Sequence, residues 1–285
     1  MKINSIRPQS NSYTQILSHI AKTPNTLYYR GTLPTERRPS VAIIGTRKPT
    51  QYGREVTNRF TEELARQGIV IVSGLALGVD GIAHQAALDA GGTTLAILAN
   101  GLSYTYPRTH ASLGEKIIAQ GGALLSEYEP STTARPHHFL ERNRIVSGLS
   151  DAIIITEASA RSGTMNTATH ALEQGKEVYV VPGPITSPMS QGCNQLIRQG
   201  ATPLLEASQI LELLLPSADD TQTRLPLGSN ELETAIIKLI SSGLRDGDEM
   251  LSELKCDATE FSTSLTMLEI NGAIRSLGAN QWTLR

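Results

Sequence analysis

The sequence predicts an α/β fold in which a doubly wound, mostly parallel sheet is covered by helices and followed by a small C-terminal domain. From residue 41, short apolar β-branched runs alternate with amphipathic stretches of helical period. Most of these runs are continuously apolar, which is typical of strands buried on both faces. Glycines follow several of the helical stretches, at the position where a helix commonly ends. These observations together indicate a parallel sheet with helices on its faces.

The predicted strands and helices alternate along residues 41–215, which we expect to form the main domain. Strands are predicted at residues 41–44, 69–72, 94–98, 123–125, 152–155 and 177–181. Helices are predicted at residues 53–67, 79–90, 109–120, 139–149, 164–174 and 192–200, with Gly68, Gly91, Gly121 and Gly175 closing four of them. Residues 1–40 are expected to form only a short N-terminal extension.

The C-terminal part separates from the main domain through a polar, proline-containing linker at residues 216–230. Three short helices are predicted at 231–242, 247–255 and 258–270, followed by a hairpin-like wing at 271–285. Three helices and a wing form a winged-helix domain, whose third helix can enter a DNA groove. That helix has no Lys or Arg but contains Glu260 and Glu269. We therefore expect the winged helix to contact protein rather than DNA.

Composition and charge narrow the class of protein. Two distant cysteines, Cys193 and Cys256, indicate neither a disulfide framework nor a zinc site. The first residues have no apolar signal segment, and no apolar run approaches the roughly 20 residues of a membrane span, so we expect a soluble cytoplasmic protein without a membrane span. The net charge is −2, with −4 on residues 228–285 and +2 on the rest.

Basic residues concentrate in one stretch near the start of the main domain. They are Arg30, Arg37, Arg38, Arg47, Lys48, Arg54, Arg59 and Arg66, against four glutamates. A basic binding surface and a solvated charged face explain this stretch about equally well.

Five loops are expected at the carboxyl edge of the sheet, where ligands of such folds bind. These loops, at 45–53, 73–80, 100–107, 157–164 and 182–188, are all rich in Gly, Ser, Thr or Pro. Glycines allow close backbone approach, and the amides at a following helix start can bind an anion. We therefore predict a phosphate-binding edge, although tight turns alone would explain one or two of these loops.

The sequence lacks the motifs that nucleotide-triphosphate enzymes, dinucleotide enzymes and serine hydrolases of this fold class require. The chain has no Walker lysine motif, no G-x-G-x-x-G turn and no G-x-S-x-G elbow. Asp80, His84 and Glu157 are the remaining catalytic candidates, but we favour helix capping for Asp80 and packing for His84. His137 and His138 are expected to have no third metal ligand. We therefore predict no catalytic residue, no bound metal and no cofactor.

The segment F139-L-E-R-N-R144 places an aromatic ring beside guanidinium groups. Phe139 and Arg142 share a helix face, whereas Arg142 and Arg144 diverge. A ring beside arginines suits a base stacked above its own backbone phosphates, as in single-strand binding. A phenylalanine taken alone is more often part of a core.

Several motifs together resemble the DNA-processing protein A (DprA/Smf) family over residues 27–215. The matching segments are V41-A-I-I-G-T-R47, S73-G-L-A-L-G-V-D-G-I-A-H84, Y106-P107, F139-L-E-R-N-R-I-V-S-G-L-S150, S162-G-T164, V181-P-G183 and S190-Q-G-C-N-Q-L-I-R-Q-G-A201. The resemblance implies an extended Rossmann-like domain that binds single-stranded DNA and loads the RecA recombinase during natural transformation, commonly as a homodimer. The implied DNA contacts are Arg47, Lys48, Ser73, Gly74, Phe139, Arg142, Asn143, Arg144, Ser162, Gly163, Thr164 and, as a lesser candidate, Lys176.

The chain departs from that family in two respects. Only about 25 residues precede Leu27–Gly31, so the helical SAM-like domain of many members is expected to be absent or vestigial. No motif for the dimer surface can be matched residue by residue, so self-association is implied by the family alone.

Two other functions stay open from the sequence. One is a Rossmann-type nucleotide phosphoribohydrolase, similar to the LOG or lysine-decarboxylase-like group, which places a glutamate three residues after the threonine of its helix start. This chain has Thr167 there. The other is a winged-helix regulator whose main domain senses a ligand.

Overall fold

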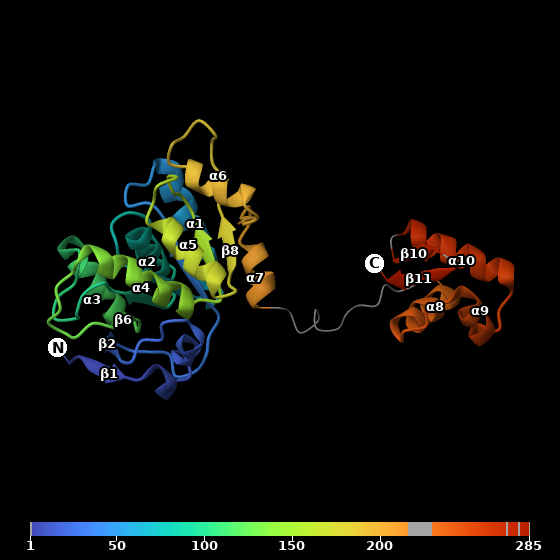
Figure 1. The fold of residues 1–285 in the computed structure, drawn as a ribbon, viewed down its shortest axis with the longest axis horizontal. Coiled ribbons are helices and arrows are strands. Elements are labelled where there is room, and N and C mark those ends of the chain that lie inside the picture. Colours follow the sequence, from blue (N-terminus) through green and yellow to red (C-terminus); the bar gives the residue numbers. More distant parts are fainter. Residues whose placement is uncertain (1, 216–229, 272, 279, 285) are drawn as a thin grey trace. The chain divides into compact units, whose positions relative to one another are not determined.

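The computed structural model describes residues 2–215, 230–271, 273–278 and 280–284. Two compact units, Met1–Leu215 and Pro216–Arg285, divide the chain and are described separately (Figure 1). Nearly all of the predicted linker, residues 216–229, lies outside the described residues. Within the described part of the chain, no helix has the length and apolar character that crossing a membrane requires.

A single nine-stranded sheet forms the centre of the first unit. Its strands lie in the spatial order β1-β2-β6-β5-β4-β3-β7-β8-β9. Their bounds are β1 Asn4–Ile6, β2 Leu27–Gly31, β3 Ser40–Ile44, β4 Val70–Ser73, β5 Thr94–Ile97, β6 Ala123–Ser126, β7 Ala152–Ile155, β8 Glu177–Val180 and β9 Thr202–Pro203. The pairs from β6 to β9 are parallel, and β1 and β2 join antiparallel. The predicted α/β fold with a mostly parallel sheet is confirmed.

The helices of this unit follow the predicted alternation closely. They are α1 Gln51–Arg66, α2 Val79–Asp89, α3 Ala111–Ala119, α4 Pro136–Leu149, α5 Thr164–Glu173, α6 Gln191–Arg198 and α7 Ser208–Leu214. Helix α4 begins three residues before its predicted start. Pro136 lies in its first turn, where the missing N–H of proline costs no intrahelical hydrogen bond. The four predicted closing glycines have positive φ angles, between 65° and 85°.

Three strands and one helix were not predicted from the sequence. Strand β2 is only partly buried, so its sequence lacks the continuous apolar run of the inner strands. Strand β9 has two residues and helix α7 has seven, too few to show a clear period. Because β1 and β2 lie in residues 1–40, this segment extends the sheet and is more than a short extension.

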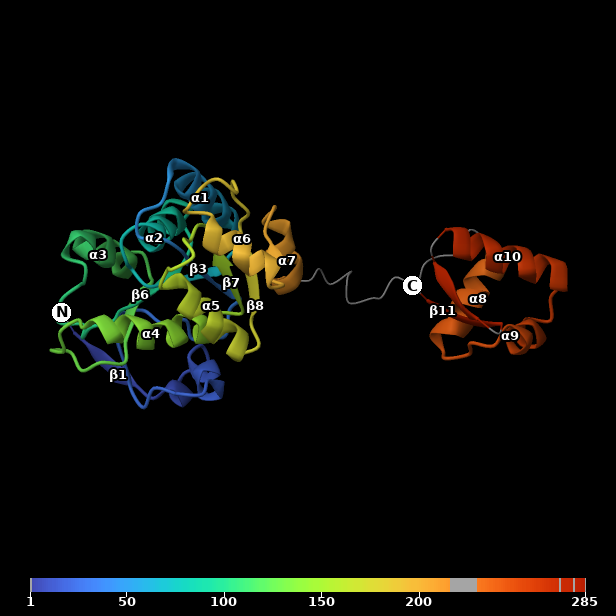
Figure 2. The same cartoon turned by 45° about the horizontal axis from the view of Figure 1, so that its top comes forward.

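Helices cover both faces of the sheet, and the side chains of alternate strand positions divide into separate cores. One core joins the sheet to α4, α5, α6 and the N-terminal segment. On the opposite face, two clusters join the sheet to α1, α2 and α7 and to α3. Figure 2 shows strands between α2 and α4, which lie on opposite sides of them. The fold is therefore doubly wound, as the continuous apolar strands predict.

The N-terminal segment is part of the core beneath α4. Tyr13 and Leu17 are fully buried and belong to the same apolar cluster as Ile145 and Leu149 of α4. The Tyr13 hydroxyl lies 2.7 Å from the Ser40 hydroxyl at the start of β3, and burial raises the pKa of Tyr13 to about 12. These contacts fix the back of α4, whose other residues line the cavity described below.

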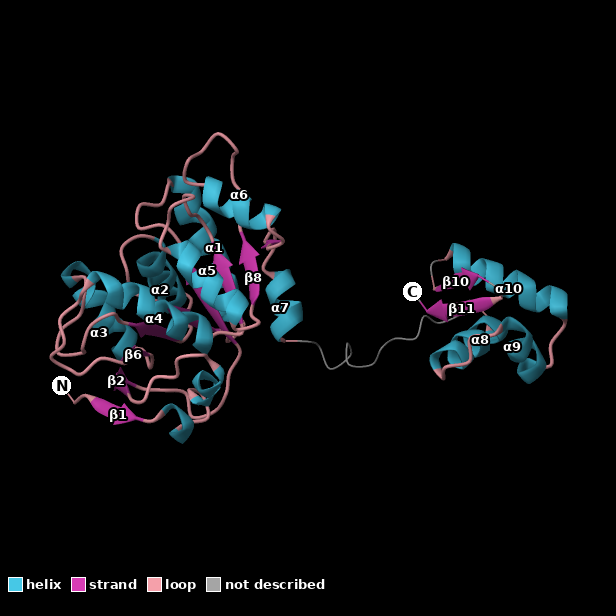
Figure 3. Ribbon diagram, viewed as in Figure 1, coloured by secondary structure: helices cyan, strands magenta, loops and turns pink. Residues whose placement is uncertain are grey.

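The described residues of the second unit form three helices and a hairpin, drawn in Figure 3. Its elements are α8 Glu231–Ser241, α9 Gly247–Leu254, α10 Ala258–Ile270, and the antiparallel strands β10 Ile274–Gly278 and β11 Gln281–Leu284. Ile236, Met250, Phe261 and Leu265 form a separate apolar core. The elements occur in the predicted order, and the assignment as a winged helix stays a prediction.

We predict that Leu17→Ala lowers the free energy of unfolding of the chain by about 2–5 kcal/mol, because it opens a cavity between the N-terminal segment and α4. Urea denaturation followed by circular dichroism measures this change. Gln15→Ala is the matched control, since Gln15 is exposed in the same segment. Equal stability of the two variants would contradict a core role for residues 1–40.

Candidate functional site

The strand order creates a crevice at the carboxyl end of β3. From β3 the chain proceeds through β4, β5 and β6 on one side, and then returns to β7 on the other side. The loops after β3 and β7 therefore diverge from each other. Open α/β sheets bind their ligands at such a switch point.

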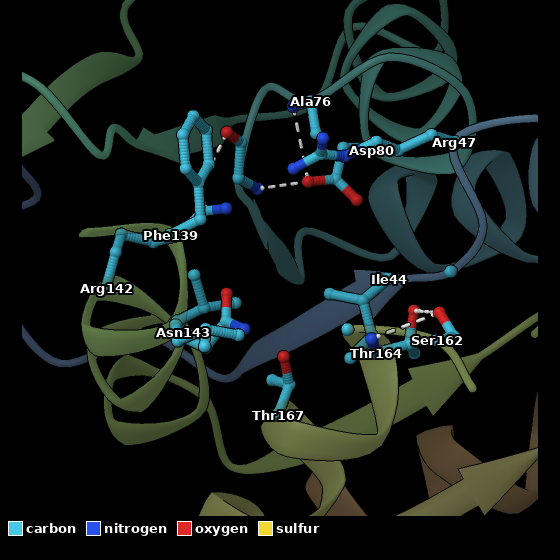
Figure 4. Close-up of a pocket in the computed structure, with 15 residues that line it drawn as sticks. Ile44, Arg47, Ala76, Asp80, Phe139, Arg142, Asn143, Ser162, Thr164 and Thr167 are labelled. Atoms are coloured by element: carbon cyan, nitrogen blue, oxygen red, sulfur yellow. Dashed lines mark hydrogen bonds between the residues drawn. The ribbon is translucent and has the colours of Figure 1, made fainter. Parts of the chain in front are cut away.

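A cavity of about 320 Å³ occupies this position (Figure 4). The turn after β3 contributes Gly45 and Arg47, and the turn after β4 contributes Gly74. The loop before α5 contributes residues 162–164, and helix α4 closes the remaining side with residues that include Asn143. Asn143 donates a side-chain hydrogen bond to Asn166, at 3.2 Å. Three of the five predicted loops thus meet at one site.

The loop before α5 contributes an amide without a described acceptor to the cavity lining. The Ser162 hydroxyl accepts a hydrogen bond from the Thr164 amide at 3.2 Å and donates to the Thr164 hydroxyl at 2.9 Å. Among the described hydrogen bonds, the Gly163 amide has no acceptor, and a Cβ added at Gly163 would meet no atom within 4 Å. An exposed amide at a helix N-terminus, with the helix dipole behind it, is suited to bind an anion.

Arg142 is buried and holds the neighbouring turn in place. Its guanidinium donates to the carbonyl of Gly74, at 2.7 Å, and to the carbonyl of Ile97. The Asp80 carboxylate accepts from the amides of Gly74, at 3.1 Å, and Ala76, at 3.3 Å. Burial lowers the pKa of Arg142 and raises that of Asp80, and the attraction between the two charges opposes both shifts. One nitrogen of Arg142, Nη1, is therefore engaged by two backbone carbonyls, whereas the buried Nε has no hydrogen-bond partner among the described residues.

An exposed cation and two aromatic rings lie at the mouth of the cavity. The Arg47 guanidinium lies 5.2 Å from the centre of the Phe139 ring. The Tyr106 ring, 43% exposed, lies 5.6 Å from the Phe139 ring at an angle of 59°. Tyr106 was not among the predicted contacts, although the Tyr106-Pro107 pair carries part of the family resemblance. The three side chains form a surface on which a flat base can stack.

Four predicted contact residues do not face this cavity. Arg144 forms an ion pair with Glu127, at 2.6 Å, beside a different cavity between the N-terminal segment, α4 and α5. Lys176 precedes β8 and therefore lies at the amino edge of the sheet. The Ser73 hydroxyl donates to the Ile43 carbonyl at 2.7 Å. Lys48 is exposed next to Arg47, outside the cavity lining.

The catalytic candidates are occupied by structural contacts. His84 is fully buried with its Nδ1 atom 2.7 Å from the Thr94 hydroxyl, and burial lowers its pKa to about 3. Glu157 accepts hydrogen bonds from the Thr50 amide, at 2.8 Å, and the Thr50 hydroxyl, at 2.7 Å, just before α1. The packing role expected for His84 agrees with its contact. The capping role expected for Asp80 is wrong, because Gly78 is the N-cap of α2 and the Asp80 carboxylate instead binds two amides of the preceding turn.

The expectation that no third ligand accompanies His137 and His138 is wrong. Glu141 lies one helical turn after His137, and the potential ligand atoms of the three residues lie within 4.8 Å of one another. Tyr128 stacks on His138 with ring centres 4.1 Å apart and donates to the Glu141 carboxylate at 2.8 Å. Glu141 was not expected beside the histidines, because the sequence predicts residues 136–138 as a loop, whereas the structure includes them in the first turn of α4.

Comparison with known protein families assigns residues 4–215 to the family of DNA recombination-mediator protein A. Protein Smf of Escherichia coli is 43% identical over 209 residues, which cover 73% of this chain and 56% of that protein. DNA processing protein DprA of Bacillus subtilis is 42% identical over 214 residues, or 74% of this chain and 71% of that protein. The chain thus spans little more than half the length of the E. coli relative.

Solved structures show the same fold in related proteins. DNA processing protein A of Streptococcus pneumoniae superimposes with a TM-score of 0.70 at 36% identity, covering 75% of each chain. That of Helicobacter pylori has a TM-score of 0.66 at 34% identity, covering 75% of this chain and 96% of that chain. The matched segment contains the whole sheet and every residue of the cavity. Family match, sequence identity and shared fold agree, and the chain belongs to the DNA recombination-mediator protein A family.

Proposed function

We propose that this chain binds single-stranded DNA at the carboxyl edge of its sheet. In this proposal a backbone phosphate lies in the cavity against the Gly163 amide, and Arg47 contacts it from the mouth. The neighbouring base stacks on Phe139 and Tyr106. The observation that carries the proposal is the amide of Gly163, just before α5, which is unpaired among the described residues and lies in the lining of a cavity beside an exposed arginine and two aromatic rings.

The site suits an internal phosphodiester better than a terminal phosphate. A phosphodiester carries one negative charge, which amides and a single guanidinium can bind without a lysine of the Walker type. Exposed rings offer stacking energy only to bases that are free of a duplex. Contacts to phosphate and ring faces do not distinguish bases, so we expect binding that is largely independent of sequence.

The relatives support this proposal. The H. pylori structure was determined to explain a single-stranded DNA binding mode. The residues that form the cavity here all lie within the segment shared with the family. A role as an enzyme is disfavoured, because the carboxylates of Asp80 and Glu157 are engaged by the protein and Thr167 stands where phosphoribohydrolases place a glutamate.

We further propose that the chain passes the bound strand to the RecA recombinase during natural transformation, acting in the cytoplasm as a homodimer. The description of its family as recombination mediators supports the RecA step. The acidic residues of α10 favour a protein partner for the second unit, since Glu260 and Glu269 would be repelled by phosphates.

We predict that Arg47→Ala weakens binding of labelled oligothymidine by roughly ten-fold, because it removes a charge-assisted contact worth about 1.5–3 kcal/mol. The slope of log K against log salt should become shallower by about 0.7. Fluorescence anisotropy titrations at several salt concentrations measure both quantities. Arg59→Ala is the matched control, because Arg59 is already paired with Glu63 at 3.1 Å. Equal affinity of the two variants would place the strand elsewhere.

Gly163→Val tests the amide directly. A side chain here meets no protein atom within 4 Å, and its backbone φ of −60° suits any residue, so we expect the melting temperature to change little. The branched side chain projects from the cavity lining beside the amide and obstructs a phosphate there, so we expect loss of most single-strand binding. Gly163→Ala should give a smaller loss in the same anisotropy assay. A valine variant that folds and binds at full affinity would rule out the phosphate position.

The RecA step has its own test. We expect the chain to shorten the lag before RecA hydrolyses ATP on single-stranded DNA that is coated with a single-strand binding protein. The Gly163→Val variant should not shorten this lag, since it cannot hold the strand. A lag unchanged by the wild-type chain, at concentrations that saturate the DNA, would reject RecA delivery while leaving DNA binding intact.

A further inference from the structure

We propose that the single strand continues from the cavity across Arg47 into a groove between α1 and α2, where Arg54 holds the phosphates of the following nucleotides. This inference rests on the proposed function and adds a second subsite with its own residues. None of them was among the contacts predicted from the sequence, apart from Arg47, which borders both places.

The groove adjoins the phosphate cavity at Arg47. It has a volume of about 500 Å³, and Arg47 lines both it and the cavity. The first turns of α1 supply Arg54 and Asn58, and α2 supplies Gln85. A strand whose phosphate lies against Gly163 would therefore reach the groove by passing Arg47.

The charges around the groove favour binding of a polyanion. On α1, Arg59 is paired with Glu63 at 3.1 Å and Arg66 with Glu62 at 2.7 Å. The groove lining contains no Asp or Glu, and among the described residues neither Arg47 nor Arg54 has a carboxylate partner.

The rest of the basic stretch is likewise occupied. Arg30 is paired with Glu115 at 2.8 Å, Arg37 bonds to Asp151, and Arg38 donates to the Gly68 carbonyl at 2.9 Å. The basic stretch, for which the sequence allowed either a binding surface or a solvated face, therefore divides into two groups. Most of its arginines bind acceptors within the protein, and a small group beside the site has no carboxylate partner among the described residues. That small group consists of Arg47, Lys48 and Arg54.

The groove also offers surfaces for bases and sugars. Leu77 is 46% exposed at its edge, beside Gly78, whose φ of +80° and contact with the backbone of residues 46 and 47 exclude a side chain. The His110 ring is fixed by its Nδ1–H, which donates to the Leu75 carbonyl at 2.9 Å. Apolar, amide and cationic groups together match a nucleotide chain better than a simple anion.

Oligothymidines of about 4 and about 12 nucleotides separate the two subsites, since single-strand sites commonly span about 4–16 nucleotides. We expect Arg54→Ala to leave the affinity for the short strand unchanged. It should weaken the long strand by roughly ten-fold and flatten the salt slope for it by about 0.7. Arg66→Ala, on the same helix but outside the groove, should bind both strands like the wild type.

The outcomes distinguish this inference from the proposed function. Wild-type affinity of Arg54→Ala for both lengths, together with lost binding by Gly163→Val, would overturn the groove and keep the cavity. An equal loss on both lengths would also overturn it, because Arg54 would then act on the cavity itself. If the wild type binds neither strand, the proposed function fails and the inference with it.

Discussion

The buried guanidinium of Arg142 is the contact on which the site depends. It extends from α4 to the carbonyls of Gly74 and Ile97, after β4 and at the end of β5, and so joins a crossing helix to the carboxyl edge of the sheet. Gly74 is required beneath it, because any Cβ there would collide with the guanidinium. Asp80 lies near Arg142 and binds two amides of the same turn, so one small network fixes three walls of the cavity. Removing one member of such a buried charged network commonly costs about 3–5 kcal/mol.

In this arrangement, the residues that position the site differ from those proposed to bind the ligand. Arg142 donates through Nη1 to two backbone carbonyls and is attracted to the nearby carboxylate of Asp80, so we assign it a positioning role rather than the long-range attraction of a ligand. The attraction falls instead to Arg47, in solvent at the mouth, and to the amide of Gly163. Exposed charges are screened by salt and buried ones much less. We therefore expect the salt dependence of binding to depend on Arg47 and its neighbours without described carboxylate partners. The shape of the cavity depends instead on the contacts of Arg142.

Much of the fold could be predicted from local pattern. The inner strands β3 to β8 are apolar on both faces, so their runs are continuous and unmistakable, and the closing glycines mark where helices end. Strands β1, β2 and β9 gave no such signal, because β1 and β9 are short edge strands and β2 is only partly buried. The loop 157–164 was predicted as part of an anion-binding edge for a similar local reason, its small polar residues before a helix, whereas residues 162–164 were singled out by the family resemblance.

The sequence by itself determined the alternation of strands and helices, the family motifs and the loops at the carboxyl edge. Only the tertiary structure decided which loops meet, because strand order depends on long-range pairing that local pattern does not contain. It also decided the roles of similar residues. Arg142 and Arg144 are two positions apart, yet one is buried beneath the cavity and the other is paired with Glu127 on another side of α4. Arg47 and Arg54 stay free while Arg59 and Arg66 are neutralised, since charge pairing depends on which side chains meet in space.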